Sequence, residues 1–470
     1  MPWRLSSFAA VLFAWLLFPR IASAHAELLG SDPPTGSSME RSPTELRLFF
    51  SEPVTPGLTE LSLIDERGRR LDRGPGRIDS ENGRLLSAMV DELPPGVYTL
   101  SYRALSSIDG HIDRGVITFA IGTTDSIPPQ SAIEILRQQD FWTSGALRWM
   151  SYLAVLLLLG LPAFRVFVAG SSRAGLSSTQ LAALDTRLTR LLLCSAITLA
   201  ISSLGQIVEQ SFQLADSGSL GGVLAAAESL VVRTRYGGIW LGRLVLAAAV
   251  AGVLKGHLQV SAAERTQRWG GAVILAVLTL YTFATLSHAS SALDASWIGL
   301  VLSWVHLISI SVWLGGLAGL LLSASLGVSA RLAAAFRGIA TGSVAMILIS
   351  GIGQSLLLVG DVRALTQTLH GQLLLLKLVA VLGAVVVAWQ VRQIALARAR
   401  SGLHALPRLI AQLRLEFGLG ATALGLTALL VYLPPAWQTY RQQLRARPTD
   451  AETIVHDLKW STRIQPGRPG

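Results

Sequence analysis

The chain has 470 residues, of which 51% are hydrophobic and only 14% are charged. Soluble proteins usually carry about 25% charged residues, so this composition excludes a wholly soluble protein. The formal net charge is +10, but most arginines fall in short stretches between apolar runs, where positive charge orients membrane spans. We therefore expect contact with membrane lipid and no nucleic-acid partner. The single cysteine, Cys194, excludes an intrachain disulfide and a thiolate metal cluster.

Residues 1–24 have the three parts of a secretory signal peptide. Arg4 precedes an apolar run, and the run is followed by the small Ala-Ser-Ala sequence that ends at Ala24. The apolar run is shorter than the roughly 20 residues that a membrane-spanning helix needs, which favours cleavage over an uncleaved anchor. We predict cleavage before His25 and export of the residues that follow.

Residues 25–124 are predicted to form an all-β domain. Apolar and polar residues alternate over 46–50, 97–102 and 115–121, and these runs are rich in β-branched and aromatic residues. Pro and Gly clusters separate the runs. Short strands at this spacing indicate a sandwich or barrel of about 100 residues. A Pro-Pro pair then marks a linker, which we place at 125–144.

This domain contains a candidate copper site. After cleavage, His25 carries a free α-amine beside its imidazole, and the two groups can chelate one ion. Asp109 and His111 are two residues apart, so they face the same side of an extended segment. Two imidazoles, an amine and a carboxylate form a set that suits Cu(II) among the common divalent ions. The alternatives are that His25 is an accident of cleavage and that Asp109 belongs to a solvated turn.

Four segments of the domain occur in an order that resembles the copper-resistance C family (CopC). They are residues 25–34, 48–54, 107–111 and 115–121. The resemblance implies a periplasmic cupredoxin-like or immunoglobulin-like β-sandwich in which His25, Asp109 and His111 bind Cu(II). It also implies that Glu52 lies beside these ligands without being one of them.

Residues 145–435 are predicted to form an all-α, polytopic membrane bundle of about eight helices. The apolar runs reach spanning length and contain many Gly, Ala and Ser residues, which allow membrane helices to pack closely. The runs are 147–168, 188–208, 237–254, 270–287, 298–322, 338–359, 371–391 and 414–434. Residues 436–470 form a C-terminal tail.

Positive residues gather in alternate loops of this bundle. If the β-domain lies outside, the outer loops contain only Arg233, Arg235 and Arg363, and the inner loops contain most other cations. The positive-inside rule then predicts a multi-pass protein of the cytoplasmic (inner) membrane, with the N-terminal domain and the C-terminus in the periplasm.

Two segments of the bundle resemble each other. Residues 236–246 and 370–380 each open a span on the outer side and place a cation two turns inside, at Arg243 and Lys377. Four spans separate the two segments, which predicts two four-helix halves in parallel orientation. Chance similarity between apolar sequences is the alternative.

Three histidines lie in or beside spans on the predicted outer side. His288 ends the fourth span, His306 lies inside the fifth, and His370 begins the seventh. Ionisable groups inside spans are costly and usually functional. The alternative is a pair of interfacial histidines and one core histidine that bonds to a neighbour. His257 and His404 fall in predicted cytoplasmic loops, where we expect them to be solvated.

The membrane domain resembles the copper-resistance D family (CopD). The resemblance rests on residues 236–243, 287–289, 304–316 and 414–435. It implies an inner-membrane copper protein, and joined CopC and CopD modules imply copper uptake. The spans contain only two methionines, Met150 and Met346, and the β-domain only Met39 and Met89. We therefore do not expect a ladder of thioether ligands for Cu(I).

These features predict a non-enzymatic protein that captures Cu(II) in the periplasm and passes copper to the membrane domain for import. The membrane path would include His288, His306 and His370 and would carry Cu(I), with a periplasmic copper chaperone or reductant as a partner. No nucleotide-binding motif occurs, so transport would be passive, ion-coupled or redox-coupled. One alternative is a resistance protein that sequesters copper without transport. Another is a haem- or copper-dependent membrane redox protein, with His306 and His370 as haem ligands.

Overall fold

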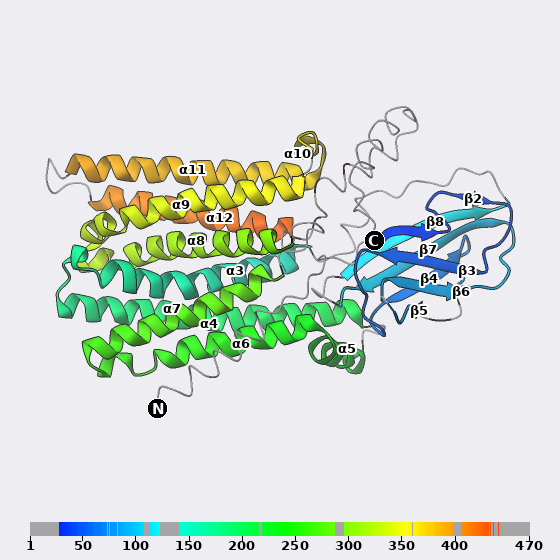
Figure 1. Cartoon of the computed structure of the whole chain (residues 1–470), viewed down its shortest axis with the longest axis horizontal. Helices are drawn as coiled ribbons and strands as arrows, with labels where there is room; N and C mark the ends of the chain where they lie inside the picture. The colour runs from blue at the N-terminus through cyan, green and yellow to red at the C-terminus, as the bar shows by residue number, and fades with distance from the viewer. Residues whose placement is uncertain are drawn as a thin grey trace, which may run out of the picture.

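The computed structural model contains a β-domain joined to a helical domain (Figure 1). It describes residues 28–72, 74, 76–81, 83–107, 112–122, 141–215, 219–286, 296–359, 361–398, 406–431, 433, 436 and 440. The long helices lie side by side, and the β-domain sits at one end of the bundle. We call this end the β-domain end and the opposite one the far end.

The β-domain is a sandwich of two four-stranded sheets, in the orders β1-β3-β6-β5 and β2-β8-β7-β4. All strand pairs are antiparallel except β2 and β8. The strands are β1 (Leu28–Asp32), β2 (Ser38–Met39), β3 (Glu45–Phe50), β4 (Glu60–Asp65), β5 (Arg77–Ile78), β6 (Leu85–Met89), β7 (Gly96–Leu105) and β8 (Ile112–Ile121). The predicted strands therefore exist, and the prediction of a β-sandwich is confirmed.

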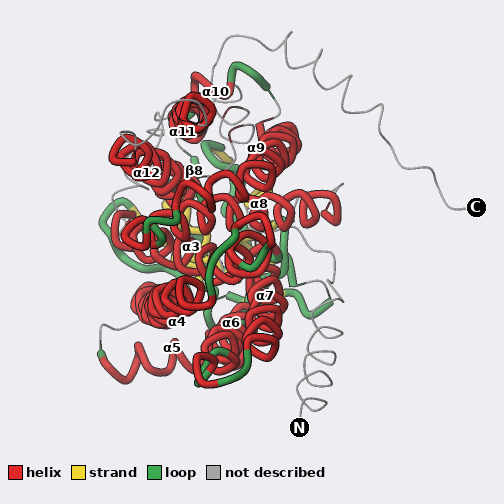
Figure 2. The backbone as a smooth tube through the Cα atoms, turned by 90° about the vertical axis from the view of Figure 1, so that its left-hand side faces the viewer, coloured by secondary structure: helices red, strands yellow, loops and turns green. Residues whose placement is uncertain are grey.

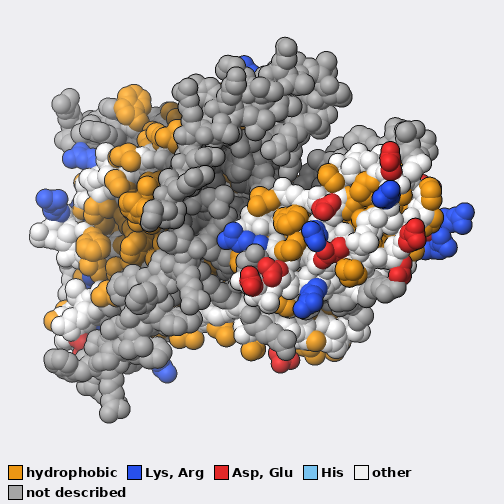
Figure 3. All heavy atoms as spheres, turned by 45° about the vertical axis from the view of Figure 1, so that its right-hand side comes forward, with side chains coloured by type: hydrophobic (Ala, Val, Ile, Leu, Met, Phe, Trp, Pro, Cys, Tyr) orange, Lys and Arg blue, Asp and Glu red, His pale blue; other side chains and the backbone are white. Residues whose placement is uncertain are grey.

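Alternation explains why these segments form strands. Leu46, Leu48 and Phe50 of β3 are at most 2% exposed, whereas the residues between them face solvent. Leu100 of β7 and Phe119 of β8 enter the same core from the other sheet. The outer surface carries scattered acidic and basic side chains, and the visible flank of the helical domain is mainly hydrophobic (Figure 3).

The helical domain contains eight long helices among the described residues. They are α3 (Phe141–Phe164), α4 (Ser178–Leu214), α6 (Arg235–Val253), α7 (Ala262–Ala284), α8 (Ser296–Leu322), α9 (Ser329–Val359), α11 (Leu369–Arg398) and α12 (Leu406–Leu430). Seven are long and apolar enough to cross a membrane; α7, with charged residues in its first two turns, is the eighth. This agrees with the prediction of about eight helices.

Two further helices, α5 (Leu220–Arg233) and α10 (Ala364–Gln367), are too short to span a membrane. Figure 2 looks along the bundle, so the long helices appear end-on while α5 runs across the view. Each short helix leads directly into a long one, α6 or α11. The sequence prediction placed loops at both positions.

The helices follow one order twice: two long, one short, two long. The start of α6 and the start of α11 also share their geometry. Thr234 accepts a hydrogen bond from the Gly237 amide and donates to a carbonyl of α5, and Thr368 does the same with Gly371 and α10. A Cβ on either glycine would lie 2.4 Å from the preceding helix backbone. The predicted division into two parallel halves is therefore present in the structure.

The halves meet where α3 crosses α8. A Cβ at Gly160 would lie 2.1 Å from the Ser311 carbonyl oxygen, and a Cβ at Gly315 would lie 2.3 Å from the Gly160 Cα. Only glycine allows two helix backbones to approach this closely. Outside this crossing, α3 packs on α12 and α8 packs on α7. Since α3 is equivalent to α8 and α7 to α12, these two contacts between the halves are also equivalent.

Candidate functional site

Glu52 lies at one end of the β-sandwich, two residues after β3, and its side chain is completely buried. The Ser106 hydroxyl donates a hydrogen bond of 2.6 Å to its Oε2. Backbone bonds from Thr55 to Leu105 and from Ser107 to Pro53 tie the two segments together. Glu52 is therefore held next to the end of β7, which leads into the predicted copper segment.

The predicted copper ligands His25, Asp109 and His111 lie outside the described residues. Ser107 and Ile112, which flank the segment that contains Asp109 and His111, are described. Ser107 donates to the Pro53 carbonyl, next to Glu52, and Ile112 begins β8. The structure thus places Glu52 and the two flanking residues at one end of the sandwich.

This end of the sandwich contacts the helical domain. Leu58 and Leu105 of the β-domain form a buried cluster with Leu230 of α5 and with Tyr236 and Trp240 of α6. The partly buried side chains that pack on this cluster are Ile112, Ile207 and Leu286. The docking of the β-domain is therefore an apolar contact with the β-domain ends of α4, α5 and α6.

Two arginines of the β-domain flank the apolar contact. Arg103 and Arg114 donate hydrogen bonds of 3.3 and 2.8 Å to the backbone carbonyl of Gln213, in the last turn of α4. The C-terminal end of a helix carries partial negative charge, which suits cations. Burial lowers the pKa of Arg114, and the nearby charge of Arg103 lowers it further. The Arg114 guanidinium is nevertheless a strong enough base to remain charged.

His306 lies on α8, inside the bundle and towards the β-domain end. Its Nδ1 is 2.9 Å from the hydroxyl of Ser350 on α9. Ser350 is 1% exposed and donates its own proton to carbonyls one turn earlier on α9. A Cβ on Gly351 would lie 3.4 Å from the imidazole Cε1, at van der Waals distance, so this glycine faces the ring.

The structure describes only part of the predicted membrane path beyond His306. His288 lies outside the described residues, although Leu286 beside it is described. His370 is in the first turn of α11, at the β-domain end. The prediction of a path through these histidines is therefore not tested as a whole.

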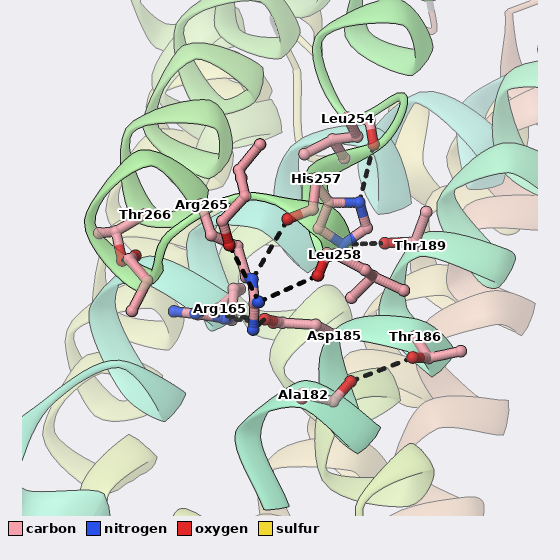
Figure 4. A network of polar contacts seen from close by, with 12 residues as sticks. Arg165, Ala182, Asp185, Thr186, Thr189, Leu254, His257, Leu258, Arg265 and Thr266 are labelled. Atoms are coloured by element: carbon pink, nitrogen blue, oxygen red, sulfur yellow. Dashed lines mark hydrogen bonds and ion pairs between the residues drawn. The ribbon is translucent and has the colours of Figure 1, made fainter. Parts of the chain in front are cut away.

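The expectation that His257 is solvated is wrong. Its side chain is 2% exposed at the far end of the bundle, where Nδ1 lies 2.7 Å from the Leu254 carbonyl oxygen and Nε2 lies 3.1 Å from the Thr189 hydroxyl. The nearby Arg165 and Asp185 form a buried ion pair (Figure 4). The loop folds back onto α4, so a position between two spans in the sequence did not predict exposure. His404 lies outside the described residues.

The sequence analysis missed Ser350, which contacts His306, and Gln354, which is one turn further along α9. Ser350 and Gln354 lie one helical turn apart on α9, on the side that faces α8. A signal was present: the pattern Ile-Ser-x-x-Gly-Gln occurs at 201–206 and again at 349–354. Among the described residues, no three His, Cys, Asp or Glu side chains gather as a metal site.

Comparison with protein families covers most of the chain. Residues 28–122 match the CopC domain, residues 139–296 match the copper resistance protein D-like N-terminal domain, and residues 330–430 match copper resistance protein D. These are the two families that the sequence segments resembled.

Individual relatives agree with the family matches. The copper transport protein CutJ of Bacillus subtilis (strain 168) is 26% identical, and the match covers 98% of this chain and 83% of CutJ. The inner membrane protein YebZ of Escherichia coli (strain K12) is 31% identical over 44% of this chain and 71% of YebZ. The crystal structure of CopC from Methylosinus trichosporium OB3b matches at 27% identity with a TM-score of 0.20, over 22% of this chain and all of that one.

Proposed function

Because the chain belongs to the family of copper resistance and transport proteins that join a CopC domain to a CopD membrane domain, we propose that it imports copper. The β-domain captures Cu(II) with His25, Asp109 and His111, and it passes copper to the helical domain. The helical domain conducts it across the cytoplasmic membrane, without enzymatic chemistry on another substrate.

The observation that supports transfer most directly is the docking of the β-domain. Ile112, which follows His111 in the chain, and Leu286, which lies two residues before His288, pack on the same buried cluster. A ligand of the proposed donor site, His111, and a residue of the proposed membrane entrance, His288, are therefore each close in sequence to a residue of this buried cluster. This contact between the two domains supports transfer of copper from the β-domain to the helical domain.

The proposed Cu(II) site depends on Glu52 as a neighbour. A buried carboxylate beside a cation site adds negative charge and accepts hydrogen bonds that orient the ligands. One oxygen of Glu52 accepts a hydrogen bond from the Ser106 hydroxyl, and the carbonyl of the next residue, Pro53, accepts one from the Ser107 amide. We assign Glu52 the role of orienting this segment, and His25, Asp109 and His111 the role of ligands.

The proposed orientation puts the β-domain end in the periplasm. Arg173, Lys255 and Arg331 lie at the far end, in the connections or in the first turn of α9, while the short connection before α10 contains Arg363. An excess of cations on the cytoplasmic side is the usual arrangement in multi-pass proteins. Copper would then enter near His288 and His370 and continue past His306 as Cu(I), after reduction by a periplasmic partner.

Import is tested by copper content. Cells that lack the gene should accumulate less copper than the parent strain, and the intact gene should restore accumulation. If accumulation stays unchanged while copper sensitivity rises, the protein does not import, and sequestration in the periplasm is the better description. A Soret band in the purified protein would instead favour the haem-dependent alternative.

The ligand set is tested by moving the free amine. One glycine inserted between Ala24 and His25 would leave the imidazole in place and shift the α-amine one residue away. The full-length protein should then lose high-affinity Cu(II) binding in a chelator competition. A glycine inserted beside Gly68, in an exposed turn, is the matched control. Equal affinity of the two variants would contradict the amine as a ligand.

A further inference from the structure

The two halves of the helical domain contain equivalent polar positions. The segment 201–206 of α4 and the segment 349–354 of α9 share the pattern Ile-Ser-x-x-Gly-Gln. Each faces a helix that begins with tryptophans at the same spacing, α3 or α8. When α3 and α8 are aligned by these tryptophans and by the crossing glycines Gly160 and Gly315, Ser151 of α3 and His306 of α8 occupy equivalent positions.

In the first half, the side chains of Ser151, Ser202 and Gln206 form hydrogen bonds with one another, and we call this group the closed triad. The hydroxyls of Ser151 and Ser202 are 2.7 Å apart, and Gln206 Nε2 donates to Ser151 Oγ at 2.8 Å. Gln206 Nε2 also reaches the Ser202 carbonyl at 3.2 Å. All three side chains are at most 8% exposed. Every member of this triad has a partner within it, so its polar groups are satisfied inside the bundle.

In the second half the imidazole of His306 replaces the small hydroxyl of Ser151. On α9, Gly351, which faces the ring, stands in place of Ser203. Ser350 corresponds to Ser202 and keeps its place as hydrogen-bond partner. A larger side chain on α8 thus faces a smaller residue on α9, which is consistent with close packing.

The hydrogen bonds of Ser350 determine which nitrogen of His306 has a free lone pair. Ser350 has one hydroxyl proton, and it donates that proton to the backbone of α9. Its oxygen therefore accepts from Nδ1–H of His306. The proton is then on Nδ1, and Nε2 has the lone pair. Histidines that bind metals are usually oriented in this way, with the second nitrogen held by a hydrogen bond.

Gln354 corresponds to Gln206 but has lost its partner. Its Nε2 is buried and makes no hydrogen bond with any residue that the structure describes. An unsatisfied polar atom is costly inside a membrane. Rotation of the amide by 180° would present its carbonyl oxygen instead, which is an acceptor for a cation.

The two intramembrane cations also differ between the halves. Arg243 is fixed, because it donates to the hydroxyl and carbonyl of Thr282 at 3.0 and 2.9 Å and lies 3.8 Å from the Phe283 ring centroid. Lys377, its counterpart, has no such partner in the described part of the chain, and its charge acts on His306. In the first half, the polar triad and the intramembrane cation therefore both have hydrogen-bond partners. In the described part of the second half, Gln354 Nε2 and Lys377 do not.

We propose that the halves have diverged, and that the second half binds Cu(I) at His306 Nε2, with the Gln354 side chain beside it. The identity of the ion rests on the proposed function. Imidazole is a good ligand for copper, and a singly charged ion costs less to bury in a membrane than Cu(II). One imidazole, one amide and a nearby ammonium make a weak site, which suits an ion that must leave again.

The test is a Cu(I) titration of the full-length protein in detergent, against a chromogenic Cu(I) chelator under reducing, oxygen-free conditions. His306→Ser reproduces the residue of the first half and should fold, yet it should bind one Cu(I) fewer. Ser151→Ala is the matched control in the closed triad and should keep wild-type stoichiometry. Lys377→Met should strengthen Cu(I) binding, because a positive charge near the ion is removed.

The results separate this inference from the proposed import. Unchanged Cu(I) stoichiometry and affinity in a folded His306→Ser protein would overturn the site. Copper import at the wild-type rate in cells with His306→Ser would also overturn it and leave the proposed function intact. Loss of one Cu(I) in His306→Ser, together with no import by the wild-type protein, would support the site and overturn import.

Discussion

At the scale of single residues, hydrogen-bond direction decides what His306 can do. A histidine inside a span is a donor, an acceptor or a ligand according to which nitrogen carries the proton. Ser350 settles this because its own proton is already donated to α9. Its role is to orient the imidazole rather than to bind an ion.

Ser350→Ala should lower Cu(I) affinity about 10- to 100-fold, which is the usual effect of removing a partner that orients a metal-binding histidine. The stoichiometry at saturating Cu(I) should not change. The same chelator competition measures this, with Ser202→Ala in the first half as the control. An equal loss in both variants would indicate a general packing defect instead.

The buried ion pair of Arg165 and Asp185 is a second feature decided by single residues. The two side chains are 2% and 0% exposed, and Arg265 approaches Asp185 at 3.7 Å. Arg265 also donates to the His257 carbonyl at 3.2 Å. The network in Figure 4 therefore joins α4, α7 and the π-helical turn Arg165–Ala169, which directly follows α3, at the far end of the bundle.

Asp185→Asn should destabilise the folded protein by about 3–5 kcal/mol, because it leaves a buried guanidinium without its counter-charge. Thermal unfolding in detergent measures the change. Glu264→Gln is the control, since it breaks an exposed pair between residues four apart, which is worth about 0.3–0.5 kcal/mol. Similar losses in both variants would contradict a structural role for the buried pair.

At the scale of helices, the crossing of α3 and α8 holds the two halves together. The contact is between equivalent glycines, Gly160 and Gly315, as expected where two similar units meet about a common axis. The same crossing sets the depth of Ser151 and His306, which lie further towards the β-domain end on the same helices. The geometry of the polar positions thus depends on these glycines.

Gly160→Leu and Gly315→Leu should each destabilise the bundle by more than the roughly 1–3 kcal/mol of ordinary overpacking, because the new side chain meets backbone that cannot move aside. The yield of folded, monodisperse protein and its thermal midpoint measure the effect. Gly342→Leu is the control, since a Cβ there meets nothing within 4 Å. Tolerance at Gly160 would contradict the close crossing.

At the scale of the whole molecule, docking of the β-domain links capture to transport. Arg114 is the polar anchor of that contact, because it donates to the last turn of α4. The apolar part of the contact involves α5, which lies at the β-domain end of the bundle (Figure 1). A domain held in this way would deliver copper to one place.

Arg114→Glu should weaken docking by about 1.5–3 kcal/mol, the usual contribution of a hydrogen bond to a charged group. The new carboxylate would also face the negative end of α4. Hydrogen exchange should rise in α5 and at the start of β8, and copper import should fall while Cu(II) affinity stays unchanged. Arg77→Glu, at an exposed position of β5, is the control. Unimpaired import despite faster exchange would separate docking from transfer.

The sequence by itself determined the two-domain organisation, the β-sandwich and the number of long helices. These features follow from local patterns: side-chain alternation in β3, β7 and β8, and the length of apolar runs in the bundle. The repeat around Arg243 and Lys377 was also visible, because it lies within short continuous segments. The candidate ligands His25, Asp109 and His111 remain predictions of the sequence alone.

Only the tertiary structure decided the partners of the polar residues. Ser350 and His306 are 44 residues apart in the chain, and helix periodicity alone does not state which faces of α8 and α9 meet. The burial of His257 and the docking of the β-domain on α5 and α6 likewise depend on long-range contacts. Those contacts are what distinguish a closed polar triad in the first half from an unsatisfied one in the second.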